Sequence, residues 1–383
     1  MENLKWNQYW VNKISSIKEN ASSSDQNVFT KYYKFFFRNK ADDNDDNLFE
    51  NLKKVVDTFS NNYAKQFFFT ANVQHVLDNC DFIRPGKDIA LELFDIGYRD
   101  NNWPVSAKNV YDELNNHPEN CYSADFLNTI RKNMKATFII TTSTSVSLRK
   151  FNKYKNRAGL TISKSFPFRR EKFLENAIGT AFLVHREPTN PKRGLVVTAA
   201  HVVDVAKDAK AEMVFYSGFE TGEKEDVLVR CSFEEVVVRL GSKLSNDFDW
   251  AVIQINSEQD LPDPIFIKDD VFPEKAGRTY CLGHPFGLSL KLTWDGIITE
   301  VLPTSFRTKL ASYGGHSGSP VFNEQGDVIG LLIGQDEEFV ERKKKTFFPL
   351  PYTHSRYGAV CHSLATIGQF VEEHNNKKNK FNT

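Results

Sequence analysis

The feature that most constrains the fold is a series of short apolar runs in the second half of the chain. From about Thr137 the sequence becomes rich in β-forming residues, and after Gly179 each run is bounded by Gly, Pro, Asn or Asp, which favour turns. Many short strands with turn residues between them predict a barrel or a sandwich. The runs are Ala181–Val184, Leu195–Ala199, Val236–Leu240, Trp250–Ile255, Ile297–Val301 and Val328–Ile333.

The first 135 or so residues show a helical pattern instead. Apolar residues from Leu48 to Phe59 recur at i, i+1, i+4, i+7, i+8 and i+11, which is one stripe of an amphipathic helix. Similar patterns lie at 89–98, around Val110 and Leu114, and from Phe126 to Met134. We therefore predict a multi-domain α+β chain, in which a mainly helical domain precedes an all-β domain. The predicted parts are 1–149 (helical), 150–171 (a basic linker) and 172–383 (β-rich, closing in a short helix at 364–374).

Two triplets of phenylalanine, 35–37 and 67–69, lie in the helical part. They favour core packing between helices, with an exposed docking surface as the alternative. No catalytic or metal-binding constellation is visible before residue 135.

Composition excludes several classes of function. The 383 residues contain 49 Lys and Arg against 49 Asp and Glu, so the net charge is zero and nucleic-acid binding is disfavoured. Five widely spaced cysteines form no CxxC pair, which argues against a zinc site or a disulfide framework. The chain shows neither a signal peptide nor a membrane-spanning apolar run. We expect a cytoplasmic protein with no metal, cofactor, nucleic-acid or membrane partner.

The strongest chemical signal is the run from Gly314 to Pro320, which reads GGHSGSP. A serine hydroxyl becomes a nucleophile only when a base takes its proton and donors stabilise the resulting oxyanion. Glycines around Ser317 let successive N–H groups point into one cavity. Upstream, small residues precede His201, and histidine is the natural general base near neutral pH. Asp249, at the start of a buried run, is placed to orient that imidazole.

These motifs together carry a resemblance to a known family. The segments GTAFLV, VVTAAH, DWAVI and GGHSGSPV resemble the successive signatures of chymotrypsin-like serine peptidases, in that family's order of His, Asp and Ser. The segment from Cys281 to Leu288 is similar to the HtrA-like branch. The resemblance covers about Ala177 to Phe370 and implies two six-stranded antiparallel β-barrels, with the catalytic residues in the cleft between them.

The resemblance also implies a role for particular residues. His201 would be the general base, Asp249 its orienting partner and Ser317 the nucleophile, with the N–H groups of Gly315 and Ser317 forming the oxyanion hole. Asp247 is an alternative to Asp249, but only Asp249 abuts the apolar strand as the motif requires. Ser319 is a second serine in the motif, and its position there indicates tight packing.

Departures from the family pattern bear on substrate and compartment. The family's specificity pocket maps to Ala311, Ser312, Leu332 and Gly334, and without an Asp at Ala311 we expect a neutral, small-to-medium side chain to be preferred. Val202 and Val203 follow His201 where secreted members often carry a cysteine.

The leading hypothesis is a serine endopeptidase that acts on a protein or peptide substrate. Residues 1–149 would bind a regulatory protein partner or target the enzyme. The enzyme could also be latent, with an active site that forms only after these residues bind the partner. The alternative hypothesis is a catalytically silent, peptidase-like module that binds peptides or signals without turnover.

Overall fold

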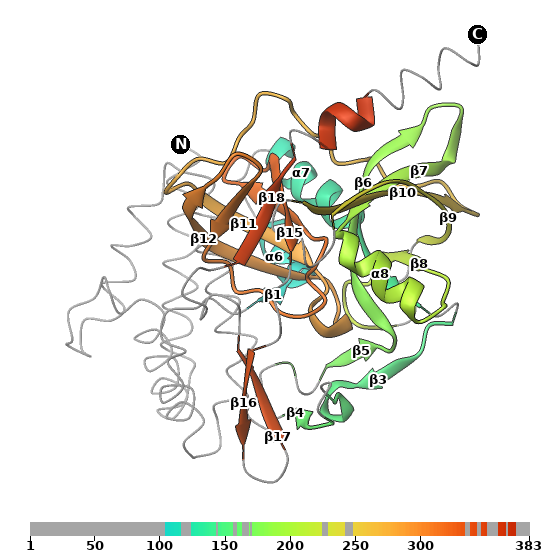
Figure 1. Cartoon of the computed structure of the whole chain (residues 1–383), viewed down its shortest axis with the longest axis vertical. Coiled ribbons are helices and arrows are strands. Elements are labelled where there is room, and N and C mark those ends of the chain that lie inside the picture. Colours follow the sequence, from blue (N-terminus) through green and yellow to red (C-terminus); the bar gives the residue numbers. More distant parts are fainter. Residues whose placement is uncertain are drawn as a thin grey trace, which may run out of the picture. The chain divides into compact units, whose positions relative to one another are not determined.

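A computed structural model gives the fold of the chain (Figure 1). The residues that it describes are 104–115, 124–142, 145–155, 159–162, 168, 171–223, 229–241, 248–333, 338–342, 346–350, 359–364 and 367–372. The chain divides into two compact units, and both β-barrels lie in the unit formed by Ser106–Lys108 and Asn128–Thr383.

The first barrel contains six antiparallel strands in the closed order β10-β7-β6-β2-β8-β9, drawn mainly in green in Figure 1. Its core consists of the inward-facing aliphatic and aromatic residues of each strand, and every residue from Trp250 to Ile255 is buried. The strands are β2 (Thr137–Thr141), β6 (Ala177–Glu187), β7 (Asn190–Thr198), β8 (Val214–Ser217), β9 (Val229–Gly241) and β10 (Asp249–Ser257).

The second barrel also closes with six strands, in the order β12-β11-β14-β15-β18-β13, because β12 pairs with β13 as well as with β11. The two-residue strand β1 (Val105–Ser106) extends this sheet beside β12. The strands are β11 (Arg278–Gly283), β12 (Lys291–Val301), β13 (Ser305–Thr308), β14 (Pro320–Asn323), β15 (Val328–Ile333) and β18 (Ala359–Ser363). The expectation of two six-stranded antiparallel barrels is thus confirmed.

Shorter elements surround the barrels. The strand β3 (Leu148–Lys150) pairs with β5 (Lys172–Leu174), and a second small sheet has the order β16-β17-β4. The members of that sheet are β4 (Thr161–Ile162), β16 (Glu338–Arg342) and β17 (Thr346–Leu350). Two single turns of 3₁₀ helix, η3 (Phe151–Lys153) and η6 (Pro285–Gly287), complete this part. The expected linker at 150–171 therefore contains regular structure.

Three helices are described besides the helical residues 367–372 at the end of the chain: α6 (Ala107–Asn115), α7 (Ala124–Lys135) and α8 (Ala200–Asp208). The patterns around Val110 and Leu114, and from Phe126 to Met134, correctly predicted α6 and α7. The helices predicted at 48–59 and 89–98, and both Phe triplets, lie outside the described residues. None of the described helices is long and apolar enough to cross a bilayer.

The helix α7 contacts both barrels. Its Arg131 donates two hydrogen bonds of 2.7 Å to the buried carboxylate of Glu220, which follows β8 of the first barrel. Its Asn133 donates to the carbonyl of Gly326, in the turn between β14 and β15 of the second barrel, at 3.5 Å.

The expected domain boundary at residue 172 needs a correction, because the first barrel starts before it. The five residues of β2 are all buried, and β2 pairs with β6 on one side and β8 on the other. The sequence changes to β-forming residues near Thr137, but the basic segment 150–171 was interpreted as the linker, which left this strand in the N-terminal part.

Candidate active site

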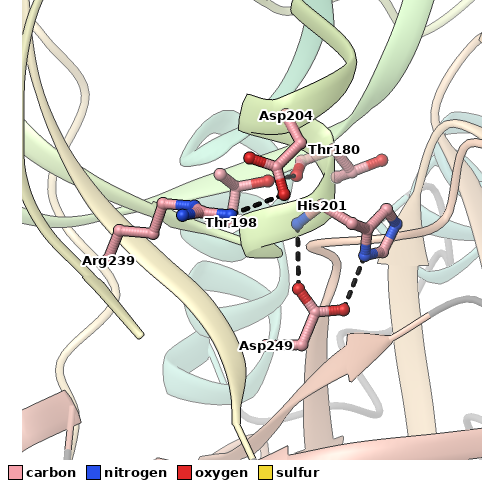
Figure 2. A network of polar contacts seen from close by, with 6 residues as sticks. All are labelled: Thr180, Thr198, His201, Asp204, Arg239 and Asp249. Carbon is pink, nitrogen blue, oxygen red and sulfur yellow. Dashed lines mark hydrogen bonds and ion pairs between the residues drawn. The ribbon is translucent and has the colours of Figure 1, made fainter. Parts of the chain in front are cut away.

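His201 and Asp249 form a directly hydrogen-bonded pair in the first barrel (Figure 2). His201 lies in the first turn of α8, and Asp249 is the first residue of β10. The carboxylate Oδ2 is 2.6 Å from the ring Nδ1 of His201, and Oδ1 accepts the backbone N–H of the same residue at 2.9 Å. Because both carboxylate oxygens are held by one residue, the imidazole has a fixed position and a fixed tautomer.

The electrostatics keep Asp249 ionised. Burial raises the pKa of its carboxyl group, but the hydrogen bonds from His201 and the electrostatic attraction of that residue outweigh the burial, so the net pKa is lowered. An ionised carboxylate only accepts hydrogen bonds, so Nδ1 of His201 donates. The lone pair of the neutral ring is therefore on Nε2, where a general base needs it.

A second histidine lies near Asp249. His362 of β18 stacks on Phe248, with ring centroids 6.3 Å apart, and its Nδ1 is 3.4 Å from the carbonyl of Thr304. Burial lowers the pKa of His362, while the carboxylate of Asp249 raises it. The second barrel thus contributes a titratable group, His362, near the His201–Asp249 pair of the first barrel.

Ser317 lies in the turn before β14, residues 314–319, which we call the serine turn, and is almost fully buried. Its carbonyl accepts the N–H of Thr180 in β6 at 2.9 Å, so the turn is attached to the first barrel. A methyl group on the adjacent Gly179 would lie 2.7 Å from Val202 of α8 and 3.1 Å from the carbonyl oxygen of Ser317. The absence of a side chain at Gly179 is therefore what brings the serine turn next to the helix that carries His201.

Four successive carbonyl groups of the serine turn are hydrogen-bonded. Gly314 accepts from the N–H of Phe286 at 2.7 Å, and Gly315 accepts from the hydroxyl of Thr180 at 2.8 Å. His316 accepts from the N–H of Ser319 at 2.9 Å, and the carbonyl of Ser317 accepts from Thr180. In a trans peptide the C=O and the following N–H point in opposite directions. The N–H groups of Gly315 and Ser317 therefore point away from the partners of Gly314 and His316.

The glycines of the turn are required by its backbone. Gly315 has φ +93° and Gly318 has φ +90°, a region that strongly favours glycine. A methyl group at Gly318 would lie 1.9 Å from the carbonyl oxygen of Thr180. Close approach of the two barrels at this point thus depends on glycine.

His316, between Gly315 and Ser317, is completely buried. Its Nδ1 accepts the N–H of Tyr313 at 3.0 Å, so the ring hydrogen is on Nε2, which has no hydrogen-bond partner among the described residues. Burial and the neighbouring His284 lower the pKa of His316 to about 3. A neutral imidazole therefore fixes the turn without adding charge beside the serine.

His284 is also buried, and its Nδ1 is 3.0 Å from the carbonyl of Leu288. Burial lowers its pKa to about 4, against the opposing effect of that hydrogen bond. Its backbone N–H donates to the hydroxyl of Thr180 at 3.1 Å. Thr180 therefore links His284 and Gly315 through one oxygen atom.

The structure brings several predicted pocket residues near the serine turn. Leu332 of β15 is buried, and its N–H and carbonyl bond to Ser319 and Gly318. Ala311 and Ser312 are buried a few residues before the turn. Gly334 and Asp247 lie outside the described residues. Ser319, the second serine of the motif, is fully buried, as tight packing predicts.

The sequence alone predicts no role for Thr180, Phe286 or His362. Thr180 stands in the segment GTAFLV, which carries part of the family resemblance. Contacts between strands far apart in the sequence leave no local pattern, so the roles of these residues emerge only from the fold.

Comparison with known proteins adds to this geometry. Residues 179–331 match the family model described as a trypsin-like peptidase domain. This segment is a trypsin-like peptidase domain. The matched segment includes His201, Asp249 and Ser317, as well as Thr180 and Phe286. No curated protein sequence matches the chain.

Solved structures also resemble this chain. One is the serine endoprotease from Yersinia pestis, with a TM-score of 0.38 and 16% identity over 66% of this chain and 67% of that one. Another is Deg5, with a TM-score of 0.35 and 16% identity over 59% of this chain and 87% of that one.

Proposed function

We propose that the chain is a serine endopeptidase with Ser317 as nucleophile, His201 as general base and Asp249 as the residue that orients the base. The observation that carries the proposal is the hydrogen-bonded His201–Asp249 pair next to a serine turn with ordered carbonyl groups. The match of residues 179–331 to the trypsin-like peptidase family supports the same reaction class.

In the proposed reaction the hydroxyl oxygen of Ser317 attacks the carbonyl carbon of the scissile peptide bond, and its proton moves to Nε2 of His201. The carbonyl oxygen becomes an oxyanion, which accepts hydrogen bonds from the N–H groups of Gly315 and Ser317. The imidazolium then protonates the leaving amine, and the C–N bond breaks to give an acyl-enzyme. Water, deprotonated by His201, releases the acid product and restores the serine.

The substrate in this proposal is a protein or peptide whose side chain at the cleaved bond is neutral and small to medium. The buried, uncharged residues Ala311, Ser312 and Leu332 support that preference, because a charged group among them would lose its hydration. Cleavage of a peptide library tests it, and selective cleavage after Lys or Arg would contradict it.

The remaining parts of the proposal concern residues 1–149 and the cellular location. A helical domain there would bind a regulatory protein partner or target the enzyme, and the support is the helical sequence pattern alone. A cytoplasmic location has the support of Cys231, Cys281 and Cys361, which are buried free thiols.

The test of the nucleophile uses the full chain with a fluorophosphonate probe and a peptide substrate. Ser317→Ala is expected to abolish labelling and to lower kcat by at least about 10⁴-fold. His201→Ala should also prevent labelling. Ser319→Ala is the matched control, because it removes a neighbouring buried hydroxyl and should leave labelling at Ser317.

Unchanged cleavage by Ser317→Ala would contradict the proposed mechanism. Peptide binding by a wild-type chain that neither cleaves the peptide nor reacts with the probe would instead favour the silent, peptide-binding module.

A further inference from the structure

One donor of the proposed oxyanion hole depends on a single contact outside the serine turn. The peptide between Gly314 and Gly315 has its carbonyl on the N–H of Phe286, at 2.7 Å. Because the peptide is trans, this bond also sets the direction of the Gly315 N–H. Among the described residues, that N–H donates no hydrogen bond to a backbone carbonyl.

Phe286 has a backbone conformation that a non-glycine residue rarely adopts. Its φ of +54° and ψ of +19° lie in the left-handed region, which disfavours side chains with a Cβ atom. Such a conformation persists only where the surroundings hold it. The N–H of Leu288 donates to the carbonyl of Pro285 at 2.8 Å, which closes a turn around Phe286. This bond does not fix the position of the Phe286 ring.

The ring of Phe286 belongs to an aromatic cluster of five residues. Its centroid is 5.6 Å from that of Phe151, 5.4 Å from Tyr154 and 5.4 Å from Tyr313. Phe173 completes the cluster, 5.8 Å from Phe151 and 5.6 Å from Tyr154. These spacings lie in the range of about 4.5–7 Å in which aromatic rings attract each other beyond the burial of their area.

The aromatic cluster connects chain segments that are distant in sequence. Phe151 lies in η3 and Phe173 in β5, whereas Tyr313 directly precedes the two glycines of the serine turn. Phe151 is completely buried, and Phe286 is 6% exposed. The rings therefore attach η6 on one side to the segment 151–154 and on the other to the start of the serine turn.

We propose that Phe286 is a positioning residue of the oxyanion hole, held in its strained conformation by the aromatic cluster. The ring fixes the backbone of η6, the N–H of Phe286 fixes the carbonyl of Gly314, and the N–H of Gly315 is thereby aimed at the substrate oxygen. The inference rests on the proposed function and adds a residue that touches no substrate.

The test compares Phe286→Leu with Phe306→Leu in the full chain. Phe306 is a fully buried ring in the core of the second barrel, within β13, so its replacement gives a matched loss of aromatic packing. Phe286→Leu is expected to lower kcat about 10- to 100-fold, because one oxyanion donor contributes about 10²–10³-fold and is here displaced and not deleted. KM should change less than about twofold, since the ground-state amide hardly uses the donor.

Two further readouts separate positioning from general stability. Phe286→Leu should weaken binding of a peptidyl boronic acid, which forms a tetrahedral adduct, by the same factor as kcat. Binding of the uncleaved peptide, measured in the Ser317→Ala background, should not change. Phe286→Tyr keeps the ring and should restore most of the activity.

A measurement independent of turnover completes the design. By hydrogen exchange with mass spectrometry, residues 313–319 should exchange faster in Phe286→Leu than in Phe306→Leu. Equal exchange in the two variants, or an active Phe286→Leu with unchanged boronate affinity, would overturn the inference. A wild-type chain without turnover would contradict the proposed function instead, and the exchange comparison would still decide whether Phe286 holds the turn.

Discussion

The two barrels present the proposed catalytic residues in different ways. In the first barrel, His201 and Asp249 lie on a helix and a strand, and two hydrogen bonds join them. In the second barrel, Ser317 lies on a turn whose backbone is held by Thr180 of the first barrel and by Phe286 of η6. The proposed base is thus fixed within one barrel, whereas the turn of the proposed nucleophile is held by residues outside it.

The barrels also differ in the polar groups that they bury. Near the serine turn, the second barrel contains three polar side chains with an atom that has no hydrogen-bond partner among the described residues: His284, Ser312 and His316. Such groups lower stability, and they often lie where function requires a special geometry. His201 and Asp249 thus hold each other within the first barrel, whereas the serine turn is held by hydrogen bonds from Thr180 and Phe286.

The largest effect should follow from breaking the pair within the first barrel. Asp249→Asn places an amide beside Nδ1 of His201, which favours the tautomer with a hydrogen on Nε2 and removes the base. We expect kcat to fall about 10⁴-fold with little change in KM. Steady-state cleavage of a peptide measures it.

Asp204→Asn is the matched control for this substitution. Asp204 is a carboxylate on the same helix, and it forms a partly exposed ion pair with Arg239 at 2.6 Å (Figure 2). Exposed pairs contribute about 0–1 kcal/mol, so activity should persist. Comparable turnover of Asp249→Asn and Asp204→Asn would show that Asp249 does not orient His201.

A smaller effect should follow from cutting the contact between the barrels. Thr180→Val keeps the shape of the side chain but leaves the carbonyl of Gly315 and the N–H of His284 without their hydroxyl partner. We expect the free energy of unfolding to fall by about 1–3 kcal/mol and kcat to fall about tenfold. Urea unfolding and kcat per titrated active site measure the two quantities.

Thr180→Ser retains the hydroxyl and should behave like the wild type in both measurements. If the valine and serine variants had equal kcat values, the serine turn would not depend on the first barrel, and the contrast between the barrels would be lost.

The last prediction concerns how the free energy of unfolding changes with pH through the buried histidines of the second barrel. The folded-state pKa values of His284 and His316 are about 4 and about 3, below the unfolded value of about 6.5. Below about pH 6.5 the unfolded chain therefore binds protons that the folded chain does not. The free energy of unfolding should fall as pH falls, by up to about 1.4 kcal/mol per pH unit for each histidine, until the folded-state pKa is reached.

His362, with a lowered pKa, acts in the same direction. Asp249 acts at lower pH, because its stabilisation is present above about pH 3.9 and is lost as pH falls through its lowered folded-state pKa. Urea unfolding at pH 7, 6 and 5 measures the slope, and His316→Asn should make it shallower. Identical slopes for that variant and the wild type would show that His316 is protonated as easily in the fold as in the unfolded chain.

The sequence was informative where the chemistry is local. The residues around Ser317, His201 and Asp249 predicted a nucleophile, a base and its orienting partner. The six short apolar runs lie in six of the twelve barrel strands, β6, β7, β9, β10, β12 and β15. The closed topology came from the family resemblance, because strand pairing leaves no trace in a single sequence beyond the alternation of buried residues.

The contacts that hold the site could not be predicted in this way. The hydroxyl of Thr180 acquires its role only when β6 meets the serine turn, and the left-handed backbone of Phe286 has none of the usual signals, since Gly or Asn is typical there. The strand β2 was assigned to the wrong side of a boundary because its partner strands lie far downstream.

The position of β2 has a practical consequence for dissecting the chain. A fragment that starts at 172, after the expected linker, would lack the strand that lies between β6 and β8. Both strands would then expose unpaired N–H and C=O groups along one edge, and open edges of this kind recruit strands from other molecules. Aggregation of such a fragment would report an opened barrel, so its lack of activity would say nothing about regulation by the preceding residues.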